Sequence, residues 1–354
     1  MRSASSVSAA RAPLARGRVW PLLRRRRRLR GLLVLPLAAA CAGCGELHTD
    51  SSALGPARPL TIALSGPASA LYAPLYVGVA DGEFTRGALR VSLTAGSSDT
   101  ASLDALESGQ AQVAIASEPA VLAARADGER VVAIGALEDG ALEAIISLRP
   151  LASPRALVGK KVGTDGTKLA AAELSSYLET AGLSAAQVRL VQASEPTARG
   201  NGAYAVVARW DLDAVALAIA HHRPNVVRVA AAGVPRYTDL AIVVRVGEAR
   251  HQGALIRAFL QSLTRAEAMT RANPTGAAQI LVRANPALSM RLELAALSAT
   301  QTVAEPSAGN QPFGYQSPYA WQSFGEWMAA RGLLRSAAVA GDTITDEFLP
   351  GQGE

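Results

Sequence analysis

The chain has very few of the side chains that catalytic and metal sites most often use. Its 354 residues include two cysteines and four histidines, and both cysteines, Cys41 and Cys44, lie near the N-terminus. The remaining residues offer no Ser/His/Asp set and no metal-ligand spacing. The sequence therefore predicts a protein that is not an enzyme and that holds no metal and no cofactor.

Aromatic residues and long apolar runs are also scarce. Phenylalanine, tryptophan and tyrosine make up 5% of the chain, whereas alanine and glycine are abundant. This composition favours helices packed closely on parallel sheets over a β-sandwich. The apolar run over residues 29–40 is about half of the roughly 20 residues that a helix needs to span a bilayer, so it does not predict a permanent transmembrane helix.

Acidic residues are absent from the first forty positions. This segment has ten arginines and no acid, which leaves 25 basic and 29 acidic side chains in residues 41–354, a net charge of −4. The overall charge of +6 therefore comes from the N-terminus, and the remainder has no basic surface for nucleic acid. A block of cations, a short apolar run and small residues are typical of a bacterial secretion signal, so we expect residues 1–40 to be a signal peptide.

The two cysteines follow this signal directly. A redox or metal C-x-x-C pair needs a folded βα context, which the polar, turn-rich segment 48–58 does not provide. The residues Leu37 to Ala40 before Cys41 instead resemble a lipobox, which predicts a diacylglycerol on the Cys41 thiol, with Cys44 as the alternative. We expect residues 41–58 to be a lipidated tether that anchors the exported protein to the membrane, on the periplasmic or extracellular face of the cell envelope.

Short apolar strands alternate with helical stretches from residue 60 onward. Strands are predicted at 60–65, 89–94, 111–117, 131–137, 142–148, 160–164 and 239–246. Helices of about a dozen residues between such strands imply right-handed βαβ units and a parallel sheet. Thr167 is a predicted N-cap for a helix that ends before Gly182, and Ser317 with Pro318 is predicted to begin the last helix.

The strands fall into two α/β units. We expect one lobe over residues 59–149 and 238–354 and a second lobe over 150–237, with crossings near 146–152 and 236–241. Ligands of open α/β sheets bind beyond the carboxyl ends of the strands. The sequence therefore predicts a ligand cleft between two lobes.

Five phrases in a fixed order carry a resemblance to a known family. They are "APLYVGVADGEF" (73–84), "LDALESGQAQVAIAS" (103–117), "LVGKKVGT" (157–164), "GVPRYTDLAIVVR" (233–245) and "FGYQSPYAWQSFGEWMAARGLL" (313–334). In these the chain resembles the periplasmic solute-binding proteins of ABC importers, in the thiamine pyrimidine synthase-like family related to sulfonate and nitrate binders. It departs from the family at "SEPTARGNGAYAVVA" (194–208), which is short and turn-like where members have a full helix.

The resemblance implies a fold, partners and a ligand. The fold is a two-lobe periplasmic-binding-protein fold, type II-like, in which each lobe is a mixed, mainly parallel sheet flanked by helices. The partners are a membrane permease and its ATPase, and the protein is a monomer. The ligand is a thiamine pyrimidine precursor, hydroxymethyl- or formylaminopyrimidine, or alternatively a sulfonate, taurine, nitrate or another small organic anion. A pyrimidine synthase-like enzyme is disfavoured, because Tyr72 replaces the histidine expected there and no cysteine follows Cys44.

Candidate ligand-binding residues lie near predicted strand ends. Tyr72 and Trp210 are candidates to stack on a planar ring, with lobe packing as the alternative for Trp210. Glu118 and Asp239 are carboxylates that can accept hydrogen bonds from an aminopyrimidine. The other candidates are small polar residues whose alternative role is to cap helices or form turns: Ser65, Ser97, Ser98, Ser117, Gly166 and Thr167.

Overall fold

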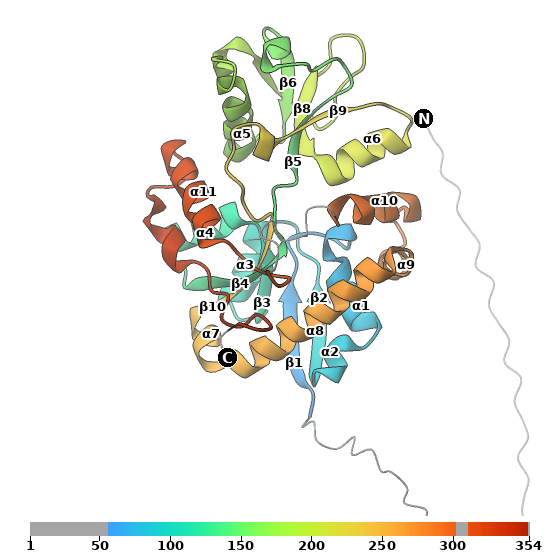
Figure 1. Cartoon of the computed structure of the whole chain (residues 1–354), viewed down its shortest axis with the longest axis vertical. Coiled ribbons are helices and arrows are strands. Elements are labelled where there is room, and N and C mark those ends of the chain that lie inside the picture. The colour runs from blue at the N-terminus through green and yellow to red at the C-terminus, as the bar shows by residue number, and fades with distance from the viewer. Residues whose placement is uncertain (1–55, 302–310, 353–354) are drawn as a thin grey trace, which may run out of the picture. The chain divides into compact units, whose positions relative to one another are not determined.

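The first of two five-stranded sheets contains both early and late parts of the chain. The computed structural model describes residues 56–301 and 311–352, and Figure 1 shows the arrangement of its helices and strands. The strand order is β2-β1-β3-β10-β4, and β10 is antiparallel to both of its neighbours. The strands are β1 (Arg58–Ala63), β2 (Leu89–Thr94), β3 (Val113–Ala116), β4 (Val131–Glu138) and β10 (Leu240–Arg245).

The second sheet repeats this plan with the middle part of the chain. Its order is β7-β6-β8-β5-β9, and β5 is antiparallel to both of its neighbours. The strands are β5 (Glu143–Ser147), β6 (Lys161–Thr164), β7 (Arg189–Gln192), β8 (Ala205–Arg209) and β9 (Asn225–Arg228). Each sheet is thus mixed and mainly parallel, which confirms the predicted fold class.

Helices flank both sheets. In the first lobe they are α1 (Ala73–Ala80), α2 (Glu83–Arg86), α3 (Asp99–Glu107), α4 (Glu118–Ala126), α7 (Val246–His251), α8 (Gly253–Ala272), α9 (Pro274–Ala284), α10 (Met290–Thr300) and α11 (Pro318–Ala330). In the second lobe they are α5 (Lys168–Glu179) and α6 (Val215–Ile219), with a π-helical turn, η4 (Trp210–Ala214), before α6. None of the helices in the described residues is long and apolar enough to cross a membrane.

The predicted helix starts are confirmed by their caps. The Thr167 hydroxyl accepts a hydrogen bond from the backbone N–H of Ala170 at 3.2 Å, and α5 begins at the next residue. The Ser317 hydroxyl accepts one from the N–H of Ala320 at 3.3 Å. In both cases a side-chain oxygen satisfies an N–H group that has no partner within the helix.

One expected boundary between the lobes is wrong. Residues 143–147 were expected in the first lobe, but β5 pairs with β8 and β9 in the second sheet. The chain therefore crosses between the sheets over residues 139–142. It returns between β9 and β10, over residues 229–239, and we call this segment the return crossing. The alternation of strands and helices predicts that β5 exists, but it carries no information about which sheet an apolar strand joins.

The segment between β7 and β8 contains no helix, as its sequence predicts. Residues 193–204 form bends and turns, and Arg149 holds them in place. Its Nε donates to the carbonyl oxygen of Thr197 at 2.9 Å, and its Nη2 donates to that of Gly200 at 3.0 Å. The loop is therefore an ordered part of the second lobe.

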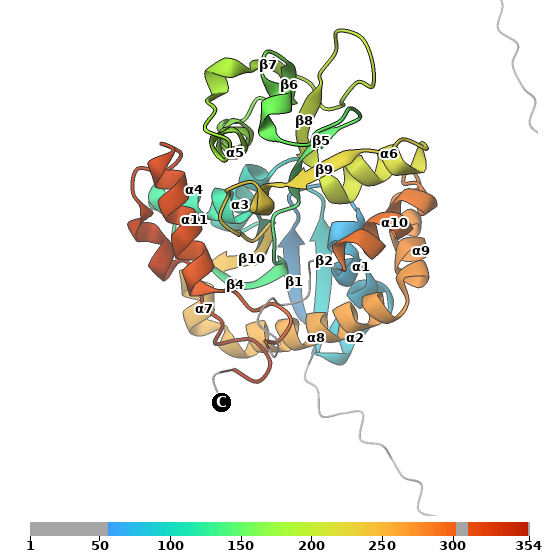
Figure 2. The ribbon, with the colours of Figure 1, turned by 45° about the horizontal axis from the view of Figure 1, so that its top comes forward.

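Helices α11 and α10 lie on opposite sides of the two crossings in both views (Figures 1 and 2). Trp327 of α11 donates from its Nε1 to the Oγ of Ser176 on α5 at 3.1 Å, which joins the lobes directly. Trp321, Phe324 and Trp327 are buried in the core. The predicted signal peptide, the predicted tether up to residue 55 and the predicted lipidation site lie outside the described residues.

Candidate functional site

A cavity of about 240 Å³ opens in the second lobe between α5, β5 and the end of β8. Four carboxylic acids and one guanidinium group line it, together with small and apolar residues. We call this the acidic cavity. The charged residues are Glu143, Asp165, Glu173, Arg209 and Asp213.

Strand direction explains why these residues meet. Arg209 is the last residue of β8, and Glu143 is the first residue of β5. Because β5 is antiparallel to β8, the two residues are direct register partners. The start of β5 therefore lies at the edge where the parallel strands of this sheet end, which is where ligands of α/β sheets bind.

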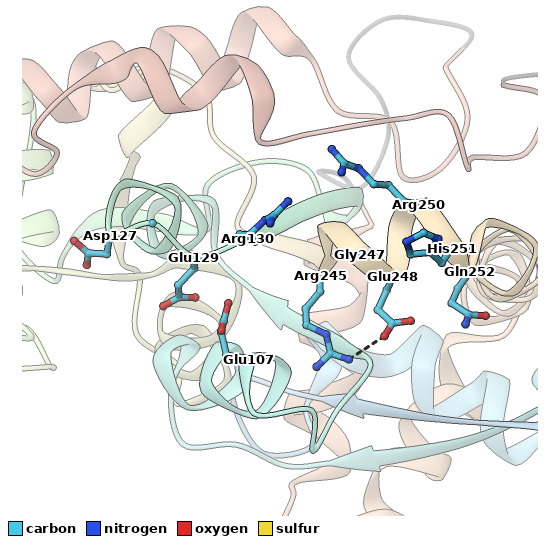
Figure 3. Close-up of a pocket in the computed structure, with 11 residues that line it drawn as sticks. Glu107, Asp127, Glu129, Arg130, Arg245, Gly247, Glu248, Arg250, His251 and Gln252 are labelled. Carbon is cyan, nitrogen blue, oxygen red and sulfur yellow. Dashed lines mark hydrogen bonds and ion pairs between the residues drawn. The ribbon is translucent and has the colours of Figure 1, made fainter.

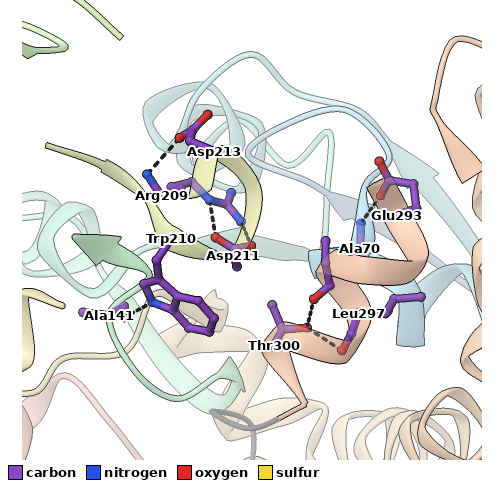
Figure 4. A network of polar contacts seen from close by, with 10 residues as sticks. Ala70, Ala141, Arg209, Trp210, Asp211, Asp213, Glu293, Leu297 and Thr300 are labelled. Carbon is purple, nitrogen blue, oxygen red and sulfur yellow. Dashed lines mark hydrogen bonds and ion pairs between the residues drawn. The ribbon is translucent and has the colours of Figure 1, made fainter. Parts of the chain in front are cut away.

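The guanidinium group of Arg209 is already engaged by a carboxylate. Its Nε donates to Oδ1 of Asp211 at 3.0 Å, and its Nη2 donates to Oδ2 of the same residue. Figure 4 shows this pair on the η4 turn, where Oδ2 of Asp213 also accepts the backbone N–H of Arg209 at 2.9 Å. Burial tends to lower the pKa of the guanidinium, but the Asp211 carboxylate raises it above its ordinary value. Arg209 therefore stays charged and bound to Asp211.

The carboxyl groups of this region hold their protons more tightly than free carboxyls do. Burial raises the pKa of Glu173 to about 8, although a hydrogen bond from Tyr237 opposes the shift. Burial also raises the pKa of Asp239 to about 7, while the charge of Arg209 lowers it. The pKa of Glu143 lies well above its ordinary value because of burial and the nearby charge of Glu173. Glu173 and Asp239 therefore titrate near neutral pH, where they can either accept or donate hydrogen bonds.

Two of the predicted residues of the first lobe bind each other. The hydroxyl groups of Ser65 and Tyr72 are 2.9 Å apart, and Tyr72 is buried. Burial raises the pKa of Tyr72, and the charges of Asp99, Arg209 and Asp239 also act on it. Tyr72 is thus electrostatically coupled to residues of the second lobe and of the return crossing.

The other serines of the first lobe have separate roles. Ser117 donates its hydroxyl hydrogen to Oδ2 of Asp99 at 2.5 Å. Ser98 accepts the N–H of Ala101 at 3.1 Å and caps α3, and Ser97 is exposed. Ser98 therefore has the capping role that was the alternative to ligand contact.

The turn before α5 lies at the mouth of the acidic cavity. Gly166 has a φ of +89°, a left-handed conformation that favours glycine. Thr167 lines the cavity, and both its backbone N–H and its hydroxyl donate to Oδ1 of Asp165 at 2.8 Å. A carboxylate of the protein therefore already stands at the N-terminus of α5.

Glu118 lies at the crossing and not in the acidic cavity. Its side chain is fully buried, and its Oε2 accepts the backbone N–H of Thr238 at 2.7 Å. Burial raises the pKa of Glu118 well above its ordinary value, which the hydrogen bond from Thr238 partly offsets. This carboxyl group joins the start of α4 to the return crossing.

Trp210 packs within the protein. Only 6% of the residue is exposed, and its Nε1 donates to the carbonyl oxygen of Ala141 at 3.3 Å (Figure 4). The guanidinium carbon of Arg228 lies 3.9 Å from the ring centroid, so one ring face has a cation–π partner. Stacking on a ligand would use the other face and stays a prediction.

Three lining residues of the acidic cavity were not predicted as site residues: Glu143, Glu173 and Arg209. Arg209 ends a strand, and the rule that selected Trp210 would also have selected its neighbour. Glu173 lies on the buried face of α5, one helical turn after Ala170, and an acid on an apolar helix face was a usable signal. Glu143 was hidden by the assignment of β5 to the first lobe.

A larger cavity of about 890 Å³ lies on the first lobe, beside α7 and residues 127–130 (Figure 3). Its lining carries both signs of charge. Arg245 donates from Nη2 to Oε1 of Glu248 at 3.0 Å and from Nη1 to the carbonyl oxygen of Leu106 at 2.7 Å. This cavity shares no lining residue with the acidic cavity.

Two mixed sheets joined by crossings, with a cavity at the strand ends, define a two-lobe binding-protein fold. Solved structures share it. The alkanesulfonate-binding protein SsuA of Xanthomonas axonopodis pv. citri bound to MOPS matches with a TM-score of 0.60 and 16% identity, over 82% of this chain and 99% of that one. The periplasmic aliphatic sulphonate binding protein SsuA of Escherichia coli matches with a TM-score of 0.62 and 15% identity, over 82% and 98%.

The chain belongs to the NMT1/THI5-like family, whose model matches residues 70–277. A curated relative from Halalkalibacterium halodurans, the formylaminopyrimidine-binding protein, is 26% identical over 333 residues, which cover 89% of this chain and 97% of the relative. The matched region includes α5, β8 and the return crossing, and therefore every charged residue of the acidic cavity.

Proposed function

We propose that this protein is the extracytoplasmic solute-binding protein of an ABC importer and that it captures a thiamine pyrimidine precursor. Formylaminopyrimidine is the first candidate ligand, because the curated relative is named for it, and hydroxymethylpyrimidine is the second. The protein acts as a monomer and delivers the ligand to a membrane permease with its ATPase. A lipid on Cys41, or alternatively on Cys44, holds it at the membrane.

The charge of the acidic cavity carries this proposal. Four carboxyl groups line the cavity, and Arg209, the one cation among its described lining residues, is bound to Asp211. An aminopyrimidine presents N–H donors, which carboxylates accept. A sulfonate or nitrate presents only negatively charged oxygens, and those carboxyl groups that are ionised would repel it.

The N-terminus of α5 also disfavours an anion. Helix N-termini bind anionic groups because their N–H groups and the helix dipole face the ligand. Here the carboxylate of Asp165 already accepts the N–H of Thr167. A sulfonate would therefore have to displace a side chain of the protein from the place where it would bind best.

The size of the cavity supports a ligand with a single ring. Its volume of about 240 Å³ lies just below the range of roughly 300–1,000 Å³ that is typical of sites for drug-sized molecules. Closure of the first lobe would add contacts from the opposite side. Tyr72, Ser65 and Ser117 are the residues of the first lobe that we assign to this side, with Trp210 and Asp239 beside the crossings.

Thermal unfolding of the purified exported protein tests the proposal. A ligand that binds only the folded state raises the melting temperature by mass action. We expect formylaminopyrimidine and hydroxymethylpyrimidine to raise it, and taurine, methanesulfonate and nitrate to leave it unchanged. If the anions raise the melting temperature and the pyrimidines do not, the proposed ligand class is wrong.

A further inference from the structure

The acidic cavity contains one carboxyl group whose position is fixed from two directions. Glu173 lies on α5, is 1% exposed and lines the cavity. The phenolic hydroxyl of Tyr237, from the return crossing, donates to Oε1 of Glu173 at 2.8 Å. Its other oxygen, Oε2, has no hydrogen-bond partner among residues 56–301 and 311–352. One oxygen is thus occupied by the protein, and the other is left to accept a donor from a ligand.

The tyrosine that holds Glu173 is itself rigidly packed. Its ring lies 4.4 Å from the ring of Phe324, measured between centroids, and Phe324 stacks on Trp327 at 5.3 Å. Trp327 donates to Ser176, one turn after Glu173 on α5. The return crossing and α11 therefore hold α5 at two successive turns, so the Tyr237 hydroxyl keeps a fixed place relative to the cavity.

The charged groups around Glu173 come from every neighbouring element. Asp165 on the turn before α5 and Asp239 on the return crossing act on it with negative charge, and Glu173 in turn acts on Glu143 of β5. Arg209 lines the same cavity but is bound to Asp211. The surroundings of Glu173 therefore favour a ligand group that donates hydrogen bonds, and the described lining residues of the cavity offer no free cation to a group that only accepts.

We propose that Glu173 is a specificity-determining residue that binds the exocyclic amine of the ligand, and that Tyr237 is the positioning residue that holds it for this contact. This inference rests on the proposed function, because it names the residues that recognise the class of ligand proposed above. It also implies discrimination between close analogues. A pyrimidine whose amine is replaced by an oxo group puts an acceptor against the carboxyl group, and when Glu173 is ionised this acceptor is left without a donor and is strongly disfavoured.

Titration calorimetry with formylaminopyrimidine tests the two residues. Tyr237→Phe keeps the packing on Phe324 and removes the hydroxyl, so the dissociation constant should rise roughly 3- to 10-fold, as expected for one lost neutral hydrogen bond. Measured above pH 8, where Glu173 is ionised, Glu173→Gln should raise the dissociation constant roughly 10- to 100-fold, because the lost contact then involves a charged group. Tyr204→Phe is the matched control, because its hydroxyl donates to Pro150 at 2.7 Å, in the same lobe and outside the acidic cavity. The dissociation constant of Tyr204→Phe for formylaminopyrimidine should stay within about twofold of the wild-type value.

Two further readouts separate positioning from loss of structure. The hydrogen bond from Tyr237 lowers the pKa of Glu173, so Tyr237→Phe should move the pH dependence of binding to higher pH. Glu173→Gln should reduce the preference for the amino over the oxo pyrimidine at least about tenfold, because an amide can also donate. If Tyr237→Phe does not fold, Glu173→Gln tests the contact with Tyr237 intact.

The outcomes distinguish this inference from the proposed function. If the wild-type protein binds formylaminopyrimidine and the Tyr237 and Glu173 variants bind it equally well with the same pH dependence, the assignment of these residues is wrong and the proposed function stands. An equal loss in Tyr204→Phe also overturns the assignment. If the wild-type protein binds no pyrimidine, both the proposed function and this inference fail.

Discussion

Replacing Glu173 by glutamine should change how the stability of the ligand-free protein depends on pH. The side chain is 1% exposed, and its pKa is raised by burial from 4.5 to about 8. In the unfolded chain this carboxyl group loses its proton near pH 4.5, whereas in the folded protein it keeps the proton up to about pH 8. Between these values the folded state binds the additional proton, so the contribution of Glu173 to stability is lost as the pH rises.

The magnitude follows from the size of the shift. A difference of one bound proton changes the free energy of unfolding by about 1.4 kcal/mol per pH unit. Between pH 5.5 and 7.5 the wild-type protein should therefore lose about 2–3 kcal/mol relative to Glu173→Gln, which cannot ionise. Glu143 and Asp239 also have raised pKa values and are present in both proteins, so the difference between the two proteins reports Glu173 together with the effect of its charge on Glu143.

Urea denaturation at pH 5.5, 6.5 and 7.5 measures this difference. We expect the stability of Glu173→Gln relative to the wild type to increase steadily with pH. The matched control is Glu326→Gln on the exposed face of α11, whose difference from the wild type should not depend on pH. A constant difference between Glu173→Gln and the wild type across this range would refute the description of Glu173 as a protonated, buried carboxyl group.

Three further changes test other parts of the structure. Trp210→Ala should lower the free energy of unfolding by about 3–5 kcal/mol, as for other buried aromatic residues; if the ligand affinity measured by calorimetry is unchanged, Trp210 has a packing role alone. Trp327→Phe should lower the free energy of unfolding, measured by urea denaturation, by about 1 kcal/mol, because the hydrogen bond to Ser176 is lost. An unchanged free energy would show that this bond does not stabilise the contact between the lobes. Cys41→Ser should move the exported protein from the detergent phase to the aqueous phase in detergent partitioning, whereas release by Cys44→Ser instead would place the lipid on Cys44.

The fold was predictable because its signals are local. Strand and helix alternation depends on residues a few positions apart, and the caps at Thr167 and Ser317 depend on a single turn. The apolar stripe on α8 is buried as its helical spacing predicts. The position of β5 was not predictable, because its choice of sheet depends on pairing with β8 and β9, which lie far along the chain.

The site was only partly predictable, for the same reason. The rule that ligands bind at the carboxyl ends of strands selected Thr167, which lines the acidic cavity. It also selected Asp239, whose charge acts on Glu173 and Glu143 of the cavity. The rule could not find Glu143, which lies at the start of a strand and reaches this edge because β5 is antiparallel to β8. It also could not find Glu173, whose role depends on the packing of α5 against the return crossing.

Direct titration of the wild-type protein with formylaminopyrimidine and, in parallel, with methanesulfonate is the closest test of the proposed ligand class. The charge of the acidic cavity predicts saturable binding of the pyrimidine and no measurable binding of the sulfonate. Saturable binding of methanesulfonate with no response to the pyrimidine would contradict it, and would show that Arg209 leaves Asp211 to bind an anion.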